Sequence, residues 1–326
     1  MDDTSTLTDP SPRKLSELFT KEEITALAER SDLRGALAIL GNWGLVAAAF
    51  VLVAQAPGPI TFVIGLCVIA GRQLGLAILQ HEGSHRTLFR TKWLNDVLTD
   101  FLCARPVWQH LGKYRAHHLR HHAKAGTDQD PDMSLHVGFP TKRASMRRKL
   151  VRDLVGITGL KTLVAFVMMD TEVIRWTVST DIEWLPREGR TWYSYPIAFL
   201  RNAWGMLVTN AVLFGILAAC GHPALYGMWV LAFFTPHPLF VRIRSIAEHG
   251  CVTRSTDVLT NTRTTRAGLL LRLTVAPNRV NYHVEHHLLA AVPFYRLPKM
   301  HRMLRQKGLL GAPPSYWDVL RLASSG

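Results

Sequence analysis

The apolar residues of this chain are gathered into four long runs, each almost free of charged side chains. A tight Pro-Gly-Pro break separates the first two runs, and Gly221 and His222 separate the last two. A helix needs about 20 apolar residues to cross the hydrocarbon core of a bilayer. Each pair of runs therefore predicts two membrane-spanning helices joined as a hairpin. The four predicted spans cover residues 35–56, 58–80, 203–220 and 223–241.

Two shorter apolar stretches, residues 93–108 and 154–169, carry charges at internal positions. Their length and charge favour a buried or interfacial helix over a fifth span. The first residues of the chain are polar and begin with acidic side chains, which is not the pattern of a signal peptide. We therefore predict an all-α integral membrane protein, in which residues 1–34 form a flexible or peripheral cytoplasmic arm and residues 35–326 form one membrane domain.

Lysine and arginine number 38 against 24 acidic residues, so the chain of 326 residues carries a formal charge of +14. An excess of this size indicates an anionic partner, either nucleic acid or a membrane surface. The connection within each predicted hairpin is uncharged, whereas the long segments after residues 80 and 241 contain many basic side chains. By the positive-inside rule, both termini and both long segments are cytoplasmic. Anchoring next to anionic lipid accounts for the charge without a nucleic-acid partner.

Eight of the 15 histidines fall into three clusters, whose members are spaced to share one face of a helix. The predicted topology brings all three clusters to the cytoplasmic side, so they predict shared metal binding within a cytoplasmic helical cap. The four cysteines stand far apart and offer neither a cysteine metal site nor a disulfide framework. The clusters are His81 and His85, then His118, His121 and His122, and finally His283, His286 and His287.

The first cluster also matches the H-E-x-x-H motif of zinc metalloproteases, in which the glutamate, here Glu82, acts as general base. An intramembrane zinc protease that uses His81, Glu82 and His85 is therefore an alternative from a different enzyme class. A catalytic zinc takes three protein ligands, whereas eight clustered histidines suffice for two metal ions. Imidazole binds iron, copper and zinc alike, so the ligand type leaves the metal open. A transporter is disfavoured, because transport sites lie near the bilayer midplane.

The order H-x-x-x-H, H-x-x-H-H and H-x-x-H-H, with one predicted hairpin between the second and third clusters, resembles the membrane fatty acid desaturase superfamily. The resemblance extends from about residue 75 to residue 308 and includes the runs at residues 114–118, 128–132 and 281–288. It implies a non-haem site of two iron ions that uses dioxygen to oxidise an unactivated C–H bond. It also implies a lipid or acyl substrate that enters from the bilayer, and a separate electron donor of the ferredoxin or cytochrome b5 type with its reductase.

Fatty acyl desaturation is the reaction that this resemblance implies first, and hydroxylation or ketolation of a carotenoid or lipid is the alternative on the same scaffold. The resemblance also implies that all eight clustered histidines are iron ligands. His249, after the last predicted span, is the ninth implied ligand, and His117 is a further candidate beside the second cluster. Other polar groups are expected to orient the rings or to hold a metal-bound water: Glu82, Asp128, Asp130, Asp132, Glu248, Asn281 and Glu285.

Overall fold

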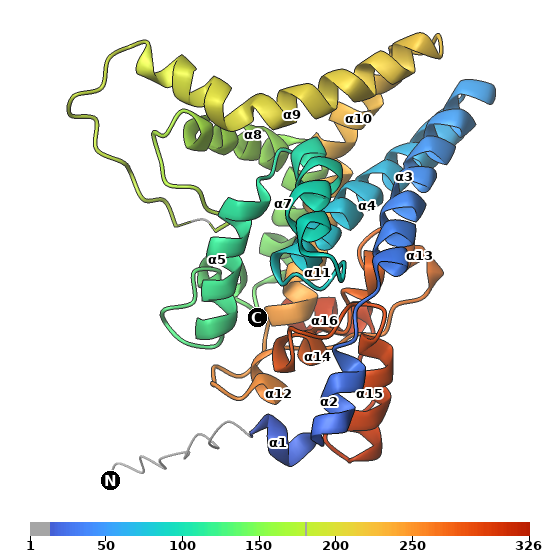
Figure 1. Cartoon of the computed structure of the whole chain (residues 1–326), viewed down its shortest axis with the longest axis vertical. Helices are drawn as coiled ribbons and strands as arrows, with labels where there is room; N and C mark the ends of the chain where they lie inside the picture. The colour runs from blue at the N-terminus through green and yellow to red at the C-terminus, as the bar shows by residue number, and fades with distance from the viewer. Residues whose placement is uncertain (1–13, 180) are drawn as a thin grey trace.

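The computed structural model describes residues 14–179 and 181–326 (Figure 1). This part of the chain is helical, and its extended pairing is limited to three isolated bridges. The all-α prediction is therefore confirmed. The α-helices are α1 (Leu15–Leu18), α2 (Lys21–Leu27), α3 (Asp32–Gln55), α4 (Pro59–Ser84), α5 (Leu111–Lys124), α6 (Met133–His136), α7 (Arg143–Leu154), α8 (Ile157–Asp170), α9 (Ser194–Ala219), α10 (Leu225–Phe234), α11 (Pro236–His249), α12 (Val258–Asn261), α13 (Leu269–Leu273), α14 (His283–Leu288), α15 (Leu297–Gln306) and α16 (Tyr316–Ala323). The π-helical and 3-10 turns are η1 (Leu94–Leu98), η2 (Asp100–Ala104), η3 (Arg105–Val107) and η4 (Pro277–Arg279).

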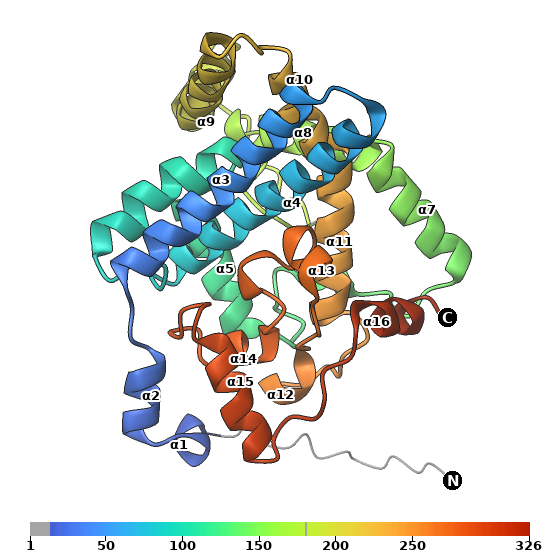
Figure 2. The ribbon, with the colours of Figure 1, turned by 90° about the vertical axis from the view of Figure 1, so that its right-hand side faces the viewer.

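The first predicted hairpin is formed by α3 and α4, which lie side by side along their length (Figure 2). Leu33, Leu37 and Leu40 of α3 are exposed, as expected for the lipid-facing side of a helix that crosses a membrane. α4 begins at Pro59, where the missing N–H costs no intrahelical bond. It continues beyond residue 80 to Ser84, so the membrane helix itself carries part of the first histidine cluster.

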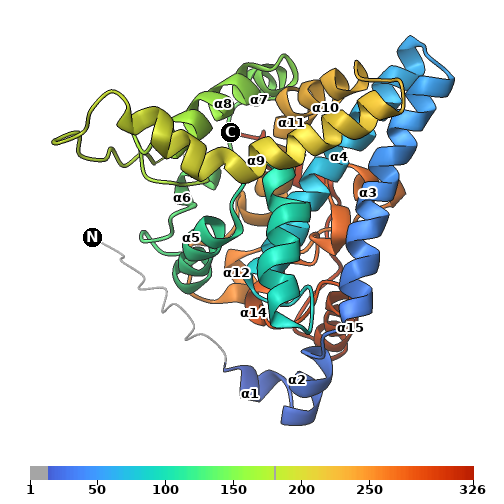
Figure 3. The same ribbon diagram turned by 45° about the horizontal axis from the view of Figure 1, so that its top comes forward.

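α9 is the third helix in the described ranges that is long and apolar enough to cross a membrane, after α3 and α4. It begins at Ser194, before the predicted start at residue 203. Arg201 interrupts the apolar run in the sequence, but it pairs with Glu172 outside the helix and does not end it. Figure 3 shows α9 crossing α10, with α8 close by, and α9 packs on both helices. The predicted buried or interfacial stretch at residues 154–169 is largely the helix α8.

The prediction of one continuous helix over residues 223–241 is wrong. α10 ends at Phe234, and α11 begins at Pro236. Proline lacks the N–H that an intrahelical bond requires, and it disfavours helical geometry in the residue before it. Thr235 accordingly departs from helical geometry, with φ −114° and ψ −80°. The return segment of the second hairpin is therefore two shorter helices that meet at a break.

α4 is the central helix of the fold and packs against α3, α5, α10 and α11. The Gln73 side-chain amide donates to the carbonyl of Trp229 at 2.8 Å, which ties α4 to α10 inside the apolar core. The ring of Trp229 stacks on that of Trp43 from α3, with centroids 5.7 Å apart. These contacts hold the two hairpins together. They thereby fix the positions of the C-terminal ends of α4 and α11 relative to each other.

The helices at the opposite end from the hairpin tips come from both termini of the chain (Figure 1). The described part of the predicted flexible or peripheral arm packs on the C-terminal helices: α2 packs on α15, and Lys307 donates to the carbonyl of Leu18 at 2.6 Å. Leu18, Phe19 and Leu27 are buried in this contact. Residues 1–13 of the predicted arm lie outside the described residues. The terminal helices thus close the fold around α14, which carries the third histidine cluster.

Candidate metal centre

The first histidine cluster lies at the end of α4, where His81 and His85 are about one turn apart. The last carbonyl groups of a helix lack intrahelical partners and need other donors. Arg115 of α5 supplies them, because its guanidinium donates to the carbonyls of Ser84 at 3.0 Å and Gly83 at 2.9 Å. This contact fixes the end of the membrane helix against the helix that carries the second cluster.

The other clusters lie on short helices that surround this end of α4. α5 carries the second cluster, and its first turn is capped by His110, whose Nδ1 accepts from the Gly112 N–H at 3.1 Å. α14 carries the third cluster, and all three of its histidines are buried. His249 is the last residue of α11. Four helices from distant parts of the sequence therefore deliver the nine predicted ligands to one region.

Five of these histidines form a first group of converging nitrogen atoms, all within 4.8 Å of one another. The Nε2 atom of His118 lies 2.9 Å from Nε2 of His85 and 3.0 Å from Nε2 of His122. Nε2 of His122 lies in turn 3.0 Å from Nε2 of His286. The group consists of His81, His85, His118, His122 and His286.

The other four predicted ligands form a second group, which also includes Glu248. It consists of two sets that share His249, each with ligand atoms within 4.8 Å of one another. Nε2 of His249 lies 2.8 Å from Nε2 of His283. The two groups adjoin, because the rings of His122 and His287 stack with centroids 4.2 Å apart. The two sets are His121, His249 and His287, and Glu248, His249 and His283.

Helical spacing decides which group each histidine joins. In the second cluster, His118 and His122 are four residues apart and join the first group, whereas His121 joins the second. In the third cluster, His283 and His287 are four residues apart and join the second group, whereas His286 joins the first. Positions i+3 and i+4 of a helix differ by about 100° in direction. One helical face therefore serves two neighbouring sites.

Most of the clustered rings are held neutral by their surroundings. Burial, followed by the charges of neighbouring histidines, lowers the pKa of His118, His286 and His287 well below its ordinary value. Burial is also the largest cause that lowers the pKa of His85 to about 4 and of His122 to about 2. Neutral imidazole is the form that binds metal ions. The rings are thus in a state ready to act as ligands.

The nitrogen atoms fit metal ions better than they fit one another. Nε2 of His118 and Nε2 of His122 each contact two further Nε2 atoms, yet a neutral ring has a single N–H to donate. Metal–nitrogen bonds of about 2.1 Å at right angles would place two ligand atoms about 3.0 Å apart, as the contacts are. Buried nitrogens without a hydrogen-bond partner among the described residues include both of His81, Nδ1 of His283, Nδ1 of His286 and Nε2 of His287.

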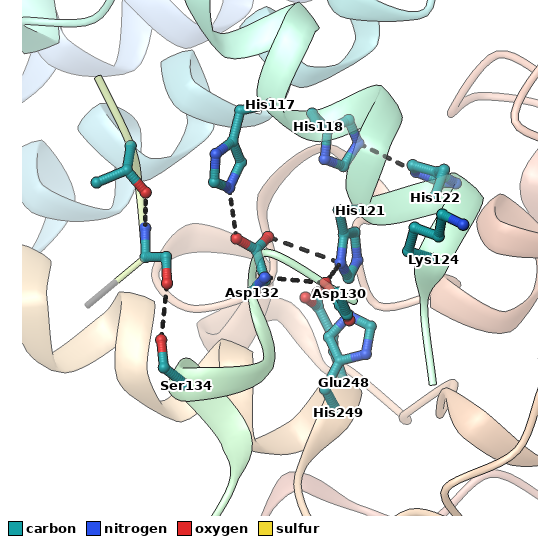
Figure 4. Close-up of polar contacts among 12 residues, drawn as sticks. His117, His118, His121, His122, Lys124, Asp130, Asp132, Ser134, Glu248 and His249 are labelled. Carbon is teal, nitrogen blue, oxygen red and sulfur yellow. Dashed lines mark hydrogen bonds and ion pairs between the residues drawn. The ribbon is translucent and has the colours of Figure 1, made fainter. Parts of the chain in front are cut away.

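Two of the expected carboxylates contact histidine rings of α5 (Figure 4). Asp130 Oδ1 lies 2.7 Å from Nδ1 of His121, and Asp132 Oδ1 lies 2.7 Å from Nε2 of His117. A carboxylate at Nδ1 keeps the proton there and leaves Nε2 of His121 with its lone pair. Burial alone would lower the pKa of His121, but the bond to Asp130 and the nearby acidic groups raise it above its ordinary value.

Glu248 lies within the second group and is held by an arginine that sequence reasoning missed. Glu248 Oε1 accepts from Nε of Arg244 at 2.8 Å, and Oε2 lies 3.8 Å from Nε2 of His283. Burial raises the pKa of Glu248 to about 7, against the opposing charge of Arg244. The spacing Arg-x-x-x-Glu on one helix face was the signal that could have identified this pair.

Glu82 and Asp128 differ from the other expected carboxylates. Glu82 Oε2 accepts from Oγ1 of Thr87 at 2.9 Å and from the N–H of Phe294 at 3.0 Å, so it ties the end of α4 to the segment after α14. It thus holds the backbone of the first cluster in place, and its Oε1 lies 3.7 Å from Nδ1 of His81. Asp128 is exposed, pairs with Arg254, and does not reach either histidine group.

The two expected residues around the third cluster point away from the converging nitrogens. Glu285 is buried, accepts from Oγ1 of Thr264 at 2.6 Å and lies 2.5 Å from Nδ1 of His301. The Asn281 amide donates to the Thr265 carbonyl at 2.8 Å, and its buried Oδ1 has no hydrogen-bond partner among the described residues. Glu285 therefore anchors α14 to α15. His301 had no spacing that could reveal this role.

His117 belongs to neither group of converging nitrogens. Its contact with Asp132 turns it away from its neighbour His118. Tyr114 is a second residue that the sequence did not reveal, although it stands one helical turn before His118. Its ring is stacked on that of His118, with centroids 5.2 Å apart. The spacing i, i+4 was the available signal.

Two comparisons with known proteins agree with this geometry. The sequence model described as fatty acid desaturase matches residues 56–319, which include every member of the two groups. The chain is also similar to the dihydrorhizobitoxine desaturase of Bradyrhizobium elkanii, with 25% identity over 296 residues. That alignment covers 88% of this chain and 80% of the relative.

Proposed function

The chain belongs to the fatty acid desaturase family, and from this premise we propose that it is a membrane di-iron enzyme that desaturates a lipid acyl chain. Its class, an oxidoreductase of the fatty acid desaturase type, follows from the family and from the desaturase name of its relative. The zinc metalloprotease alternative is thereby set aside. Its required base, Glu82, is also engaged by Thr87 and Phe294.

The observation that carries the proposal is the pair of adjoining histidine groups at the end of the apolar helix α4. We assign the five histidines of the first group to one iron, and His121, His249, His283 and His287 to the other, with Glu248 beside the second. Two bound irons supply the capacity to activate dioxygen with two external electrons and to oxidise an unactivated C–H bond. The resident side chains bind and orient these ions.

The surrounding residues prepare the site for that role. Asp130 keeps a proton on Nδ1 of His121 and so directs the lone pair of Nε2 toward its group. Arg244 balances the charge of buried Glu248. Burial of His81, His283 and His286 excludes bulk water from the reacting region. Exclusion of water strengthens the electrostatic interactions inside such a site and protects reactive species from side reactions.

The proposed substrate is a fatty acyl lipid that enters from the bilayer, since the first group lies at the end of the membrane helix α4. A second candidate follows from the name of the relative, which is a desaturase of dihydrorhizobitoxine. Hydroxylation or ketolation of a carotenoid or lipid uses the same metal chemistry and is a third outcome. The first two differ in their substrate, and the third differs from both because its product gains oxygen.

We further propose that both termini and the histidine groups face the cytoplasm, and that α10 and α11 together return the chain to that side. The uncharged hairpin connections and the basic segments around the histidines support this orientation. A separate donor of the ferredoxin or cytochrome b5 type, with its reductase, supplies the electrons. Cysteine-labelling from either side of the membrane at Cys220, which is exposed beside the second tip, tests the orientation.

The proposed reaction is tested by expressing the chain in a host of known lipid composition, with His286→Ala as the inactive control. Mass spectrometry of lipids and pigments should show products that have lost two hydrogens. A gain of one oxygen would instead identify a hydroxylase, and a gain of one oxygen with loss of two hydrogens a ketolase. Metal analysis of the purified protein should find about two irons per chain. One zinc and no iron would overturn the di-iron assignment.

A further inference from the structure

Arg72 is a charged residue in the middle of the membrane-spanning helix α4, and it belongs to neither histidine group. Its side chain is 95% buried, because the exposed fraction of the residue is 5%. Ionisable residues inside membrane segments are costly and are retained when they pair with other groups or bind a ligand. The role of Arg72 therefore requires a partner that balances its charge.

The protein balances this charge only in part. Nη2 of Arg72 donates to the carbonyls of Arg272 at 2.8 Å and Leu273 at 3.0 Å, at the end of α13. Gly71 allows this approach, because a Cβ there would lie 2.1 Å from the Leu273 carbonyl oxygen. The Nε atom has no hydrogen-bond partner among the described residues. No described carboxylate lies within ion-pair distance of the guanidinium.

Arg72 lines a groove of about 390 Å³ between α3 and the segment around η4. Arg34 lines the same groove near the start of α3, where its guanidinium lies 4.9 Å from the ring centroid of Tyr295. Leu37 and Leu45 form an apolar wall and are exposed on the side of α3 where lipid is expected. The groove thus has two cationic groups, a lipid-facing apolar wall and no acidic lining residue.

We propose that this groove binds one anionic phospholipid. Its phosphate lies against the guanidinium group of Arg34 at the start of α3, the ester region of the lipid lies along the groove toward Arg72, and an acyl chain follows the exposed leucines of α3. Guanidinium binds phosphate oxygens with paired hydrogen bonds, and anionic lipids are concentrated in the cytoplasmic leaflet of the membrane. The site is independent of the proposed reaction, because none of its lining residues belongs to the two histidine groups.

Two glycines of α3 provide a matched pair of variants. Gly41 lines the groove, and a Cβ at this position would meet no atom within 4 Å. Gly44 is also open on the same helix, but it does not line the groove. Gly41→Phe therefore adds a side chain at the groove and leaves both arginines in place in the sequence, and Gly44→Phe places the same side chain on α3 outside the groove.

The test uses the full chain in detergent micelles and measures retained lipid by native mass spectrometry after addition of dioleoyl-phosphatidylglycerol or dioleoyl-phosphatidylcholine. The wild type and Gly44→Phe should each retain one phosphatidylglycerol, in preference to phosphatidylcholine. Gly41→Phe and Arg34→Gln should retain it about tenfold more weakly, as loss of a charge-assisted contact implies. Arg72→Gln should also retain less phosphatidylglycerol, but this variant loses the hydrogen bonds to Arg272 and Leu273 as well. The comparison of Gly41→Phe with Gly44→Phe is therefore the deciding test.

Equal retention by Gly41→Phe and Gly44→Phe would overturn the proposal. So would equal retention of the two phospholipids by the wild type, or retention of added oleate in place of phosphatidylglycerol. Iron content, measured in parallel, should be the same in the wild type and in both glycine variants. This readout separates a failure of the lipid site from a failure of the proposed metal centre.

Discussion

The two histidine groups are built in different ways. The first receives His81 and His85 from α4, a membrane helix that runs without interruption from Pro59 to Ser84. The second receives His249 from α11, a shorter helix that begins after the break at Thr235. The first group contains histidines alone, whereas the second includes Glu248 and depends on carboxylates.

This difference indicates that the two sites are stabilised by different means. The continuous helix α4 is embedded in the apolar core, which holds its C-terminal end in place. Arg115 donates to the last carbonyl groups of this helix. The second group lies on shorter elements and relies on charge pairs, namely Arg244 with Glu248 and Asp130 with His121. We therefore expect variants of these pairs to affect the second group selectively.

The largest effect is expected from removal of one ligand from each group. His85→Ala and His249→Ala should each reduce the iron content from about two to about one per chain, and activity should fall by more than about 100-fold in both. Elemental analysis and product formation measure these outcomes. Loss of both irons in either variant would show that the two groups do not bind metal independently, and would contradict the proposed difference between them.

The next largest effect is expected from Arg244→Gln. Removal of this guanidinium leaves Glu248 buried beside the second group without its counter-charge. Since the pKa of Glu248 is already about 7, its carboxyl can take up a proton near neutral pH, and the loss of stability should be about 1–3 kcal/mol, which thermal unfolding should detect. The matched control is Arg254→Gln, whose pair with Asp128 is exposed and should contribute about 1 kcal/mol or less. A similar loss of stability in both variants would contradict the role of the buried pair.

A smaller effect is expected from Asp130→Asn. The amide cannot hold the proton on Nδ1 of His121 as the carboxylate does, so metal affinity should fall by about 10–100-fold. Iron titration of the metal-free protein measures this change. Asp128→Asn, two residues earlier in an exposed position, should leave the affinity unchanged. Equal titration curves for the two variants would show that Asp130 does not orient His121.

The smallest effect is expected from His117→Gln. His117 contacts Asp132 but belongs to neither group, so the iron content should remain at the wild-type level. Loss of the buried contact should lower stability by about 1 kcal/mol. A variant that lost iron would place His117 among the ligands, and so would remove the distinction between the groups and their surroundings.

The sequence predicted the helical class and the three histidine clusters, because both depend on local periodicity. It predicted the first hairpin closely, since α3 and α4 are continuous apolar helices. It failed at residues 223–241, where Pro236 ended a helix within an apolar run that hydropathy alone reads as continuous. It placed α2 in a flexible or peripheral arm and did not predict its packing on α15, because this contact joins residues almost 300 positions apart.

The sequence by itself determined which histidines stand on a common helical face, because positions i, i+3 and i+4 are set by the helix turn. Only the tertiary structure decided how those faces divide between two groups, since the division depends on where α4, α5, α11 and α14 meet. The same holds for the carboxylates: Asp130 reaches a histidine and Asp128 does not, although they differ by two residues in one loop. The direction in which a loop side chain points follows no regular spacing in the sequence, so it is determined by tertiary packing alone.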